Sequence, residues 1–189
     1  MAINLMRKLF TVRDFNRMVE AGILTKYDRV ELIRGEIVEM APVGRREAAC
    51  RSRLNKVFYE RLGDKVLVGI QDAVELNDVS QPQPDVCWLR FREDFYESGH
   101  PQVRDIFLLV EVADTTVEFD REVKIPLYAD AGICEVWLVD IQGECLEVYR
   151  HPLGGKYEEV LKFFRGDRVG VSAFSDVEFG VDEVLGSGG

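Results

Sequence analysis

The feature that most constrains this 189-residue chain is one glutamate inside its most apolar segment, residues 106–113. The segment reads Ile-Phe-Leu-Leu-Val-Glu-Val-Ala, which has the length of a strand and carries apolar side chains on both alternating sets of positions. A strand of this kind lies inside a sheet that is covered on both faces. Glu111 is then an interior carboxylate, which is costly unless a cation or hydrogen bonds compensate its charge. We therefore expect Glu111 to have a chemical role.

Helical and strand patterns on either side of this segment predict an α/β (α+β) fold, with a mixed β-sheet flanked by helices. Thr11 and Asp14 form a capping box at the start of the first helix. Pro126 lies inside the last predicted helix and should bend it. Helices are expected at 11–22, 45–62 and 115–132, and strands in a hairpin at 29–40 and at 65–70, 73–76, 85–89, 106–113, 133–140, 145–150 and 157–163, followed by one or two short strands up to residue 185.

The length favours one domain, which we place at residues 1–185 with a core at about 44–141. The N-terminal helix and hairpin and the C-terminal strands are additions to this core, and residues 186–189 form a flexible tail. No segment approaches the roughly 20 apolar residues that cross a membrane, so no membrane partner is expected. The N-terminal segment has charges inside its apolar run and does not resemble a signal peptide, which predicts a cytoplasmic location.

The net charge of −10 argues against a general nucleic-acid binder, because phosphate contacts need lysine and arginine. The charge is unevenly distributed: residues 1–56 carry a local +5 and the remaining residues carry −15. Arg45, Arg46 and Arg51 lie in the basic part of the second predicted helix. They form either a solvated helix face or a patch that faces phosphates, and the sequence leaves both interpretations open.

The sequence offers few residues for other kinds of catalytic, metal or nucleotide site. There are only two histidines and four scattered cysteines, which disfavours a Ser-His-Asp site, a histidine-rich metal site or a zinc site. The GxxxxGK[ST] pattern is missing, so no nucleotide cofactor is expected.

Two acids and a lysine could form a metal-dependent site. Asp85 begins a strand after Pro84, Glu111 lies in the next core strand, and Lys124 lies on the helix that follows. Carboxylate oxygens are suitable Mg²⁺ ligands, the Val112 carbonyl could add one more, and a lysine could orient water and steady the charge on a phosphate. The alternatives are a structural role for Asp85 at a strand end, a Glu111–Lys124 ion pair without metal, and a solvated Lys124.

Taken together and in order, several segments resemble the Uma-two family of restriction-endonuclease-like proteins, in the PD-(D/E)XK nuclease superfamily. The matching pieces span nearly the whole chain. They are Glu31-Leu-Ile-Arg-Gly-Glu-Ile-Val-Glu-Met40 with Pro42 and Gly44, Pro84-Asp85-Val86, Leu109-Val-Glu-Val112 with Thr116, Asp120-x-x-x-Lys124 with Tyr128-Ala129, Gly132-Ile133, and Glu135-x-Trp137-Leu-Val-Asp140.

The resemblance implies a restriction-endonuclease-like core of helix, three-strand meander, helix and strand. It implies that Asp85 and Glu111 are metal-binding acids. The lysine that usually follows the second acid by two residues is absent, since that position is Ala113, and its function would pass to Lys124. Relatives tend to carry a histidine where this chain has Glu47. Many nucleases of the superfamily place a glutamate on this helix, facing the metal, so the resemblance implies that Glu47 could be a third acidic ligand. The alternative is a salt bridge from Glu47 to Arg51, four residues further on.

These residues predict an endodeoxyribonuclease that uses Mg²⁺ or Mn²⁺, with DNA as its partner and Asp85, Glu111 and Lys124 as its catalytic residues. Cleavage of both strands needs two sites, so a homodimer is expected. The alternative is a catalytically inactive binding or regulatory module that kept the nuclease fold. Glu31, Asp120 and Tyr128 are assigned structural roles.

Overall fold

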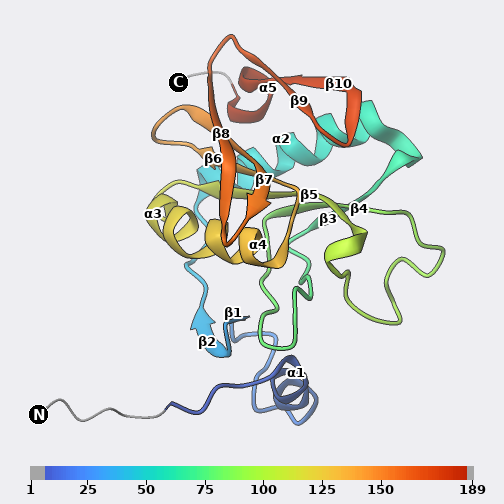
Figure 1. The fold of residues 1–189 in the computed structure, drawn as a ribbon, viewed down its shortest axis with the longest axis vertical. Helices are drawn as coiled ribbons and strands as arrows, with labels where there is room; N and C mark the ends of the chain where they lie inside the picture. The colour runs from blue at the N-terminus through green and yellow to red at the C-terminus, as the bar shows by residue number, and fades with distance from the viewer. Residues whose placement is uncertain (1–6, 187–189) are drawn as a thin grey trace, which may run out of the picture.

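The centre of the molecule is a six-stranded mixed sheet in the order β3-β4-β5-β6-β7-β8 (Figure 1). The computed structural model describes residues 7–186. Strands β5 and β6 are parallel, and the other neighbouring pairs are antiparallel. The strands are β3 (Leu67–Ile70), β4 (Val86–Leu89), β5 (Ile106–Ala113), β6 (Glu135–Asp140), β7 (Cys145–Leu153) and β8 (Lys156–Phe164). The predicted mixed sheet and its helical flanks are confirmed.

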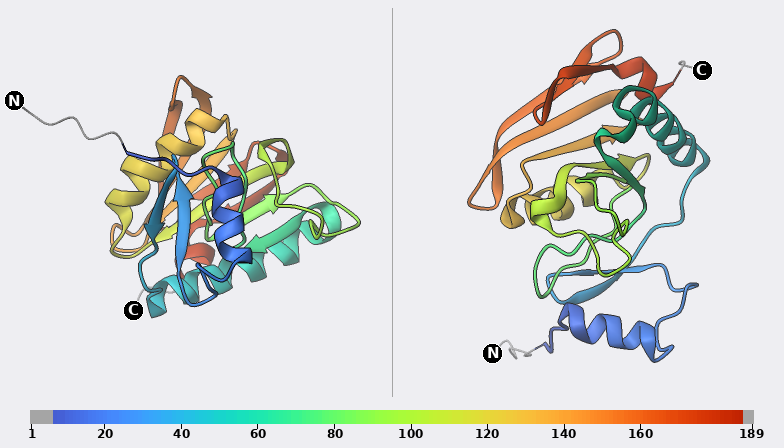
Figure 2. Two further views of the ribbon diagram at one scale, coloured as in Figure 1. Left: turned by 90° about the horizontal axis from the view of Figure 1, so that it is seen from below. Right: turned by 90° about the vertical axis from the view of Figure 1, so that its right-hand side faces the viewer.

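Helices cover both faces of this sheet. The long helix α2 (Arg45–Leu62) packs against β3, β4 and β5, and α4 (Ile125–Ala131) packs against β7 and β8. Figure 2 shows that α2 and the α3–α4 segment lie on opposite sides of the sheet. Residues Leu108–Ala113 of β5 are consequently all buried, as their double-sided apolar pattern predicts.

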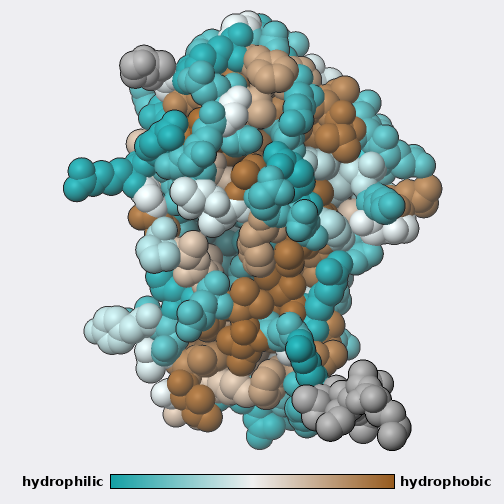
Figure 3. Space-filling view, turned by 90° about the vertical axis from the view of Figure 1, so that its left-hand side faces the viewer, coloured by the Kyte–Doolittle hydropathy of each residue, from teal (hydrophilic) through white to brown (hydrophobic). Residues whose placement is uncertain are grey.

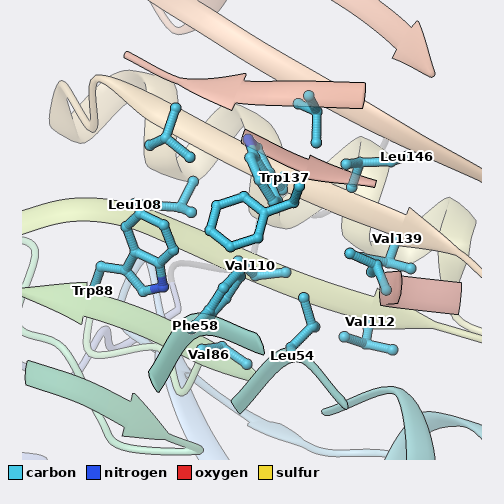
Figure 4. Packing of buried hydrophobic residues seen from close by; sticks show 14 of the residues in the cluster. Leu54, Phe58, Val86, Trp88, Leu108, Val110, Val112, Trp137, Val139 and Leu146 are labelled. Atoms are coloured by element: carbon cyan, nitrogen blue, oxygen red, sulfur yellow. The ribbon is translucent and has the colours of Figure 1, made fainter. Parts of the chain in front are cut away.

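The core on the α2 side is built around aromatic rings (Figure 4). Phe58 of α2 is fully buried, and its ring centroid lies 4.6 Å from that of Trp88 and 6.2 Å from that of Trp137, both edge-on. Phe179 lies 5.1 Å from Phe58. Such edge-to-face pairs add to the burial energy of the rings.

The C-terminal additions complete this core. They consist of β9 (Arg168–Val171), β10 (Phe174–Gly180) and a short helix α5 (Val181–Leu185). Helix α5 packs against α2, and its Val181 and Val184 are fully buried. This helix is absent from the predicted elements, because a single turn is too short to show a helical period.

The N-terminal lobe (residues 7–40) lies at one end of the molecule, below the sheet in Figure 1. It contains α1 (Val12–Glu20) and the hairpin of β1 (Val30–Ile33) and β2 (Glu36–Glu39), and Val12, Phe15 and Leu32 form its own small core. The predicted capping box of Thr11 is present. The lobe is attached by backbone hydrogen bonds between Leu32 and Gln81.

Two predicted elements differ from the structure. Residues 73–76 form no strand, because the backbone N–H groups of Val74 and Glu75 bond to the loop carbonyls of Pro82 and Pro101. The last helix is divided into α3 (Val117–Phe119), a π-helical turn η3 (Asp120–Lys124) and α4.

The π-helical turn explains how Pro126 is accommodated. The N–H of Ile125 bonds to the carbonyl of Asp120, five residues earlier. Pro126 then lies in the first turn of α4, where its missing N–H costs little. The predicted tail lies, except for Gly186, outside the described residues. In the part of the chain that the structure describes, none of the helices combines the length and apolarity needed to span a bilayer.

Candidate active site

The register of β4 and β5 brings the two predicted acids together. Val86 pairs with Val110, so Asp85, one residue before Val86, lies opposite Glu111 across the antiparallel pair. The backbone N–H of Val112 donates a 2.9 Å hydrogen bond to Oδ2 of Asp85. Asp85 and Glu111 line the same cavity, whose volume is 160 Å³.

The cavity lies between the N-terminal lobe and the core. The lobe and the segment that follows it form one wall, and the starts of α2, β4 and η3 with the end of β5 form the other. The lining residues include Arg29, Glu31, Glu39, Met40, Ala41 and Val43 on the first side, and Glu47, Arg51, Gln71, Gln83, Asp85, Glu111, Val112, Thr116, Phe119, Asp120 and Lys124 on the second. All three predicted catalytic residues therefore face one space.

Asp85 is held by a cation as well as by the backbone. Nη1 of Arg51 lies 2.8 Å from Oδ1 of Asp85, and the side chains are only 13% and 17% exposed. An arginine this close compensates the charge of a carboxylate that has little contact with water. Arg51, predicted as a nucleic-acid contact, thus pairs with Asp85, one of the predicted metal-binding acids.

Glu111 is almost fully buried and carries two donors on one oxygen. Its Oε1 accepts hydrogen bonds from Nζ of Lys124, at 3.1 Å, and from the hydroxyl of Tyr128. Burial raises the pKa of Glu111 to about 8; Lys124 opposes this rise, and Asp120 and Asp85 add to it. Glu111 therefore retains a proton to a higher pH than an ordinary glutamate.

Lys124 lies among three acids. Its Nζ lies 3.2 Å from Oε2 of Glu31 in addition to its contact with Glu111. Burial disfavours the ammonium, but the carboxylates of Glu111, Glu31 and Asp120 outweigh it and raise the pKa of Lys124. Lys124 is only 4% exposed, so the interpretation as a solvated helix residue is wrong.

Asp120 is a further acid of this cluster. It is buried in the π-helical turn, and its Oδ2 accepts a 3.0 Å hydrogen bond from the hydroxyl of Thr116. Burial raises the pKa of Asp120 to about 6, although Lys124 and Thr116 act in the opposite direction. The spacing of Asp120, Lys124 and Tyr128 by four residues indicated a shared face, and that spacing was the available signal for this group.

Glu47 does not pair with Arg51, so that predicted alternative is wrong. Its Oε2 accepts the N–H of Gly44 at 2.7 Å, and its Oε1 accepts the N–H of Asp114 at 3.2 Å. The carboxylate thereby closes the start of α2 against the end of β5. Glu47 also lines the cavity, so its role as a third metal ligand stays a prediction.

The two other predicted DNA contacts lie at the start of α2. Arg46 pairs with Asp114 at 2.9 Å and is 58% exposed, and Arg45 is exposed. The space-filling view shows apolar side chains gathered near the middle of one face with hydrophilic ones around them (Figure 3). Among the residues that line the cavity, the basic ones are Arg29, Arg51 and Lys124.

Comparisons with known proteins identify a family and a shared fold. Residues 12–182 match the family model Uma2, described as "Putative restriction endonuclease". The chain belongs to the Uma2 family. A crystal structure described as "a putative nuclease belonging to DUF820", from Anabaena variabilis, superposes with a TM-score of 0.72 at 16% identity, covering 93% of this chain and 97% of that one. That likeness shows a shared fold. The search of curated proteins finds no match.

The donor set of this Uma2 protein fits a divalent cation that keeps open positions. Asp85 and Glu111 offer hard carboxylate oxygens from adjacent strands, which is the ligand type that Mg²⁺ and Mn²⁺ prefer. The ammonium of Lys124 lies among the carboxylates of Glu111, Glu31 and Asp120, and a cation would add further positive charge to this group of acids. Within residues 7–186, no three His, Cys, Asp or Glu side chains are grouped to hold an ion together.

Proposed function

We propose that this protein is a Mg²⁺- or Mn²⁺-dependent endonuclease that hydrolyses phosphodiester bonds in DNA. The observation that carries the proposal is the juxtaposition of Asp85 and Glu111 on paired strands with Lys124 from the following helical segment, at one cavity. Membership of the Uma2 family supports a nuclease activity.

Each residue has a defined part in this proposal. Asp85, Glu111 and the carbonyl of Val112 would hold the cation, with Glu47 as a possible additional ligand at the cavity wall. The bound cation supplies Lewis acidity toward a phosphate oxygen and toward water. The raised pKa of Lys124 keeps its side chain as an ammonium at neutral pH. Lys124 therefore acts as a cation that orients water and steadies phosphate charge, and not as a general base.

The substrate contacts follow from the position of α2. Arg45 and Arg46, exposed at its first turn, would contact the DNA backbone beside the cavity. Arg51 is close enough to Asp85 to contact a phosphate that enters there. Cleavage of both strands by one assembly needs two such sites, and we propose a homodimer for this reason.

A second candidate is a catalytically inactive module with the same fold, which binds without cleaving. One observation favours it: Asp85 already has Arg51 as a counter-ion, and Glu111 already has Lys124. Ion pairs of this kind can stabilise a fold without a metal. The two candidates differ in whether metal displaces these pairs.

Nicking of supercoiled plasmid tests the proposal directly. Wild type, Asp85→Asn and Lys124→Met are purified in parallel and incubated with Mg²⁺, Mn²⁺ or EDTA. We expect metal-dependent nicking by the wild type and a loss of about 100-fold or more in both variants, since each removes a group that contacts the reacting atoms. Lys124→Arg keeps the positive charge and controls for charge alone.

The result separates the candidates. Nicking that survives in both variants would indicate a contaminant or a different set of catalytic residues. A folded wild type that neither cleaves nor gains thermal stability with millimolar metal would support the inactive module.

A further inference from the structure

Glu31 is a buried acid of the site that comes from the N-terminal lobe, whereas Glu39, which also lines the cavity from the lobe, is exposed. Glu31 lies in β1, and its carboxylate is only 3% exposed although the hairpin that carries it is outside the central sheet. A carboxylate buried this deeply must be compensated by specific partners. The groups that contact the Glu31 carboxylate therefore indicate its role.

Both partners of Glu31 belong to the elements that supply the proposed catalytic residues. Its Oε2 lies 3.2 Å from Nζ of Lys124 and accepts a 3.0 Å hydrogen bond from the backbone N–H of Gln83. Gln83 precedes Asp85 by two residues, and its side chain donates to the backbone carbonyl of Gln71. The N–H of Gln71 in turn donates to the carbonyl of Asp85.

Oε2 of Glu31 thus contacts both Lys124 on η3 and the backbone of Gln83, two residues before Asp85. Without Glu31, Lys124 would keep Glu111 as its hydrogen-bonded partner, and Asp120 would be its remaining nearby acid. Both lie on the core side of the cavity, whereas Glu31 is the one among the three acids that raise the pKa of Lys124 to lie on the lobe side. The direction of Lys124 is therefore set by opposing carboxylates from two parts of the molecule.

We infer that Glu31 is a positioning residue, which fixes the Lys124 ammonium relative to Asp85 and makes the N-terminal lobe part of the active site. The inference rests on the proposed nuclease function. It assigns a function to the lobe: separating the lobe from the core would disorder Lys124, while Asp85 and Glu111 would keep their places in the core.

The test compares Glu31→Gln with Asp130→Asn. Glutamine keeps an oxygen that can accept the Gln83 N–H but removes the charge that holds Lys124. Asp130→Asn removes the negative charge from another ion pair between lobe and core, Arg34–Asp130 at 2.7 Å, whose side chains are half exposed. Neither residue is among those that line the cavity. Glu31→Asp, which keeps the charge on a shorter side chain, serves if Glu31→Gln does not fold.

The first readout is single-turnover cleavage, with DNA affinity measured separately in Ca²⁺. We expect Glu31→Gln to lower the cleavage rate constant by about 10- to 100-fold. This is the range for residues that orient a functional side chain without contacting the substrate themselves. DNA affinity should stay within about twofold, because no substrate contact is lost. Asp130→Asn should match the wild type. Equal rates for Glu31→Gln and wild type, or an equal loss in Asp130→Asn, would overturn the inference.

The second readout does not depend on catalysis. Acetic anhydride labelling of Lys124, followed by mass spectrometry of the folded protein, reports how firmly the amine is held. Labelling should become several-fold faster in Glu31→Gln and stay unchanged in Asp130→Asn. If the wild type proves inactive, the nuclease proposal fails, and this measurement alone decides the positioning role: unchanged labelling in Glu31→Gln would refute it.

Discussion

Arg51 reaches across from α2 to place its guanidinium 2.8 Å from the carboxylate of Asp85, and both side chains are largely buried. The pair joins α2 to Asp85, the proposed metal-binding acid that lies one residue before β4. The same carboxylate cannot be fully neutralised by Arg51 and bind a cation strongly without some rearrangement. Under the proposed function, Arg51 would therefore lower the affinity of Asp85 for a cation.

Replacing Arg51 with methionine should destabilise the metal-free protein and increase its response to metal. Loss of one partner leaves Asp85 as a poorly compensated charge, which costs about 3 kcal/mol of unfolding free energy. A divalent cation that binds Asp85 restores part of this loss by mass action. Thermal denaturation with and without Mg²⁺ measures both effects.

Arg46→Met is the matched control, because the Arg46–Asp114 pair is more exposed and should contribute under about 1 kcal/mol. A gain in melting temperature with Mg²⁺ that is no larger in Arg51→Met than in wild type would show that Asp85 does not bind the cation.

Glu47 should contribute more to stability than to metal binding. Both of its oxygens accept backbone N–H groups at the junction of α2 and β5, so Glu47→Ala loses a helix cap and should cost about 1 kcal/mol. We expect the Mn²⁺ affinity, measured by calorimetry on the folded variant, to fall far less than in Asp85→Asn. A comparable fall in the two variants would instead identify Glu47 as a third ligand.

The sequence predicted the acids of this site more reliably than their partners. Asp85 and Glu111 stand out because a carboxylate in or beside an apolar strand is conspicuous, and antiparallel pairing of their strands brings them together. The pairing of Arg51 with Asp85 was not predictable in the same way, because it depends on how α2 lies across the sheet. Glu47, which is nearer to Arg51 in the sequence and at helical spacing, instead accepts a backbone N–H at the start of α2.

The role of Glu31 was hidden for a related reason. Within the sequence it lies in a short hairpin strand in which charged and apolar residues are mixed, as in many exposed hairpins. Glu31 is buried because the N-terminal lobe packs on the core. Its ion-pair partner Lys124 is 93 positions away in the sequence, so local sequence patterns do not reveal the contact. The π-helical turn was equally unpredictable, although Pro126 correctly indicated an irregularity in that helix.

Phe58→Ala should destabilise the whole protein in one cooperative step. Phe58 packs against Trp88 of the central sheet and Phe179 of β10, so its removal opens a cavity shared by core and C-terminal strands. The expected loss is about 3–5 kcal/mol in urea unfolding. Tyr59→Ala, one residue away and 70% exposed, should change stability by less than about 0.5 kcal/mol. Two separate transitions in Phe58→Ala would indicate that the C-terminal strands unfold on their own.

The metal-free protein should lose stability as the pH rises from 6 to 8. The pKa of Glu111 is raised from 4.5 to about 8, so between these values the folded state binds a proton that the unfolded state has released. The folded state then becomes less favourable with increasing pH, by at most about 1.4 kcal/mol per pH unit for one proton.

Two neighbouring groups leave this pH window unchanged. Asp120, with a pKa of about 6, contributes in the same direction but mainly below pH 6. The pKa of Lys124 is raised above 10.5, so its stabilising contribution is fully present below that value and is lost only at higher pH. The slope between pH 6 and 8 therefore reports Glu111.

Glu111→Gln, which cannot titrate, should flatten this slope when urea unfolding is measured in EDTA at several pH values. Saturating Mg²⁺ should flatten it in the wild type as well, because a cation that binds the carboxylate displaces its proton. A wild-type slope that persists in Glu111→Gln would assign the titration to another group, and a slope that Mg²⁺ leaves unchanged would separate Glu111 from the metal.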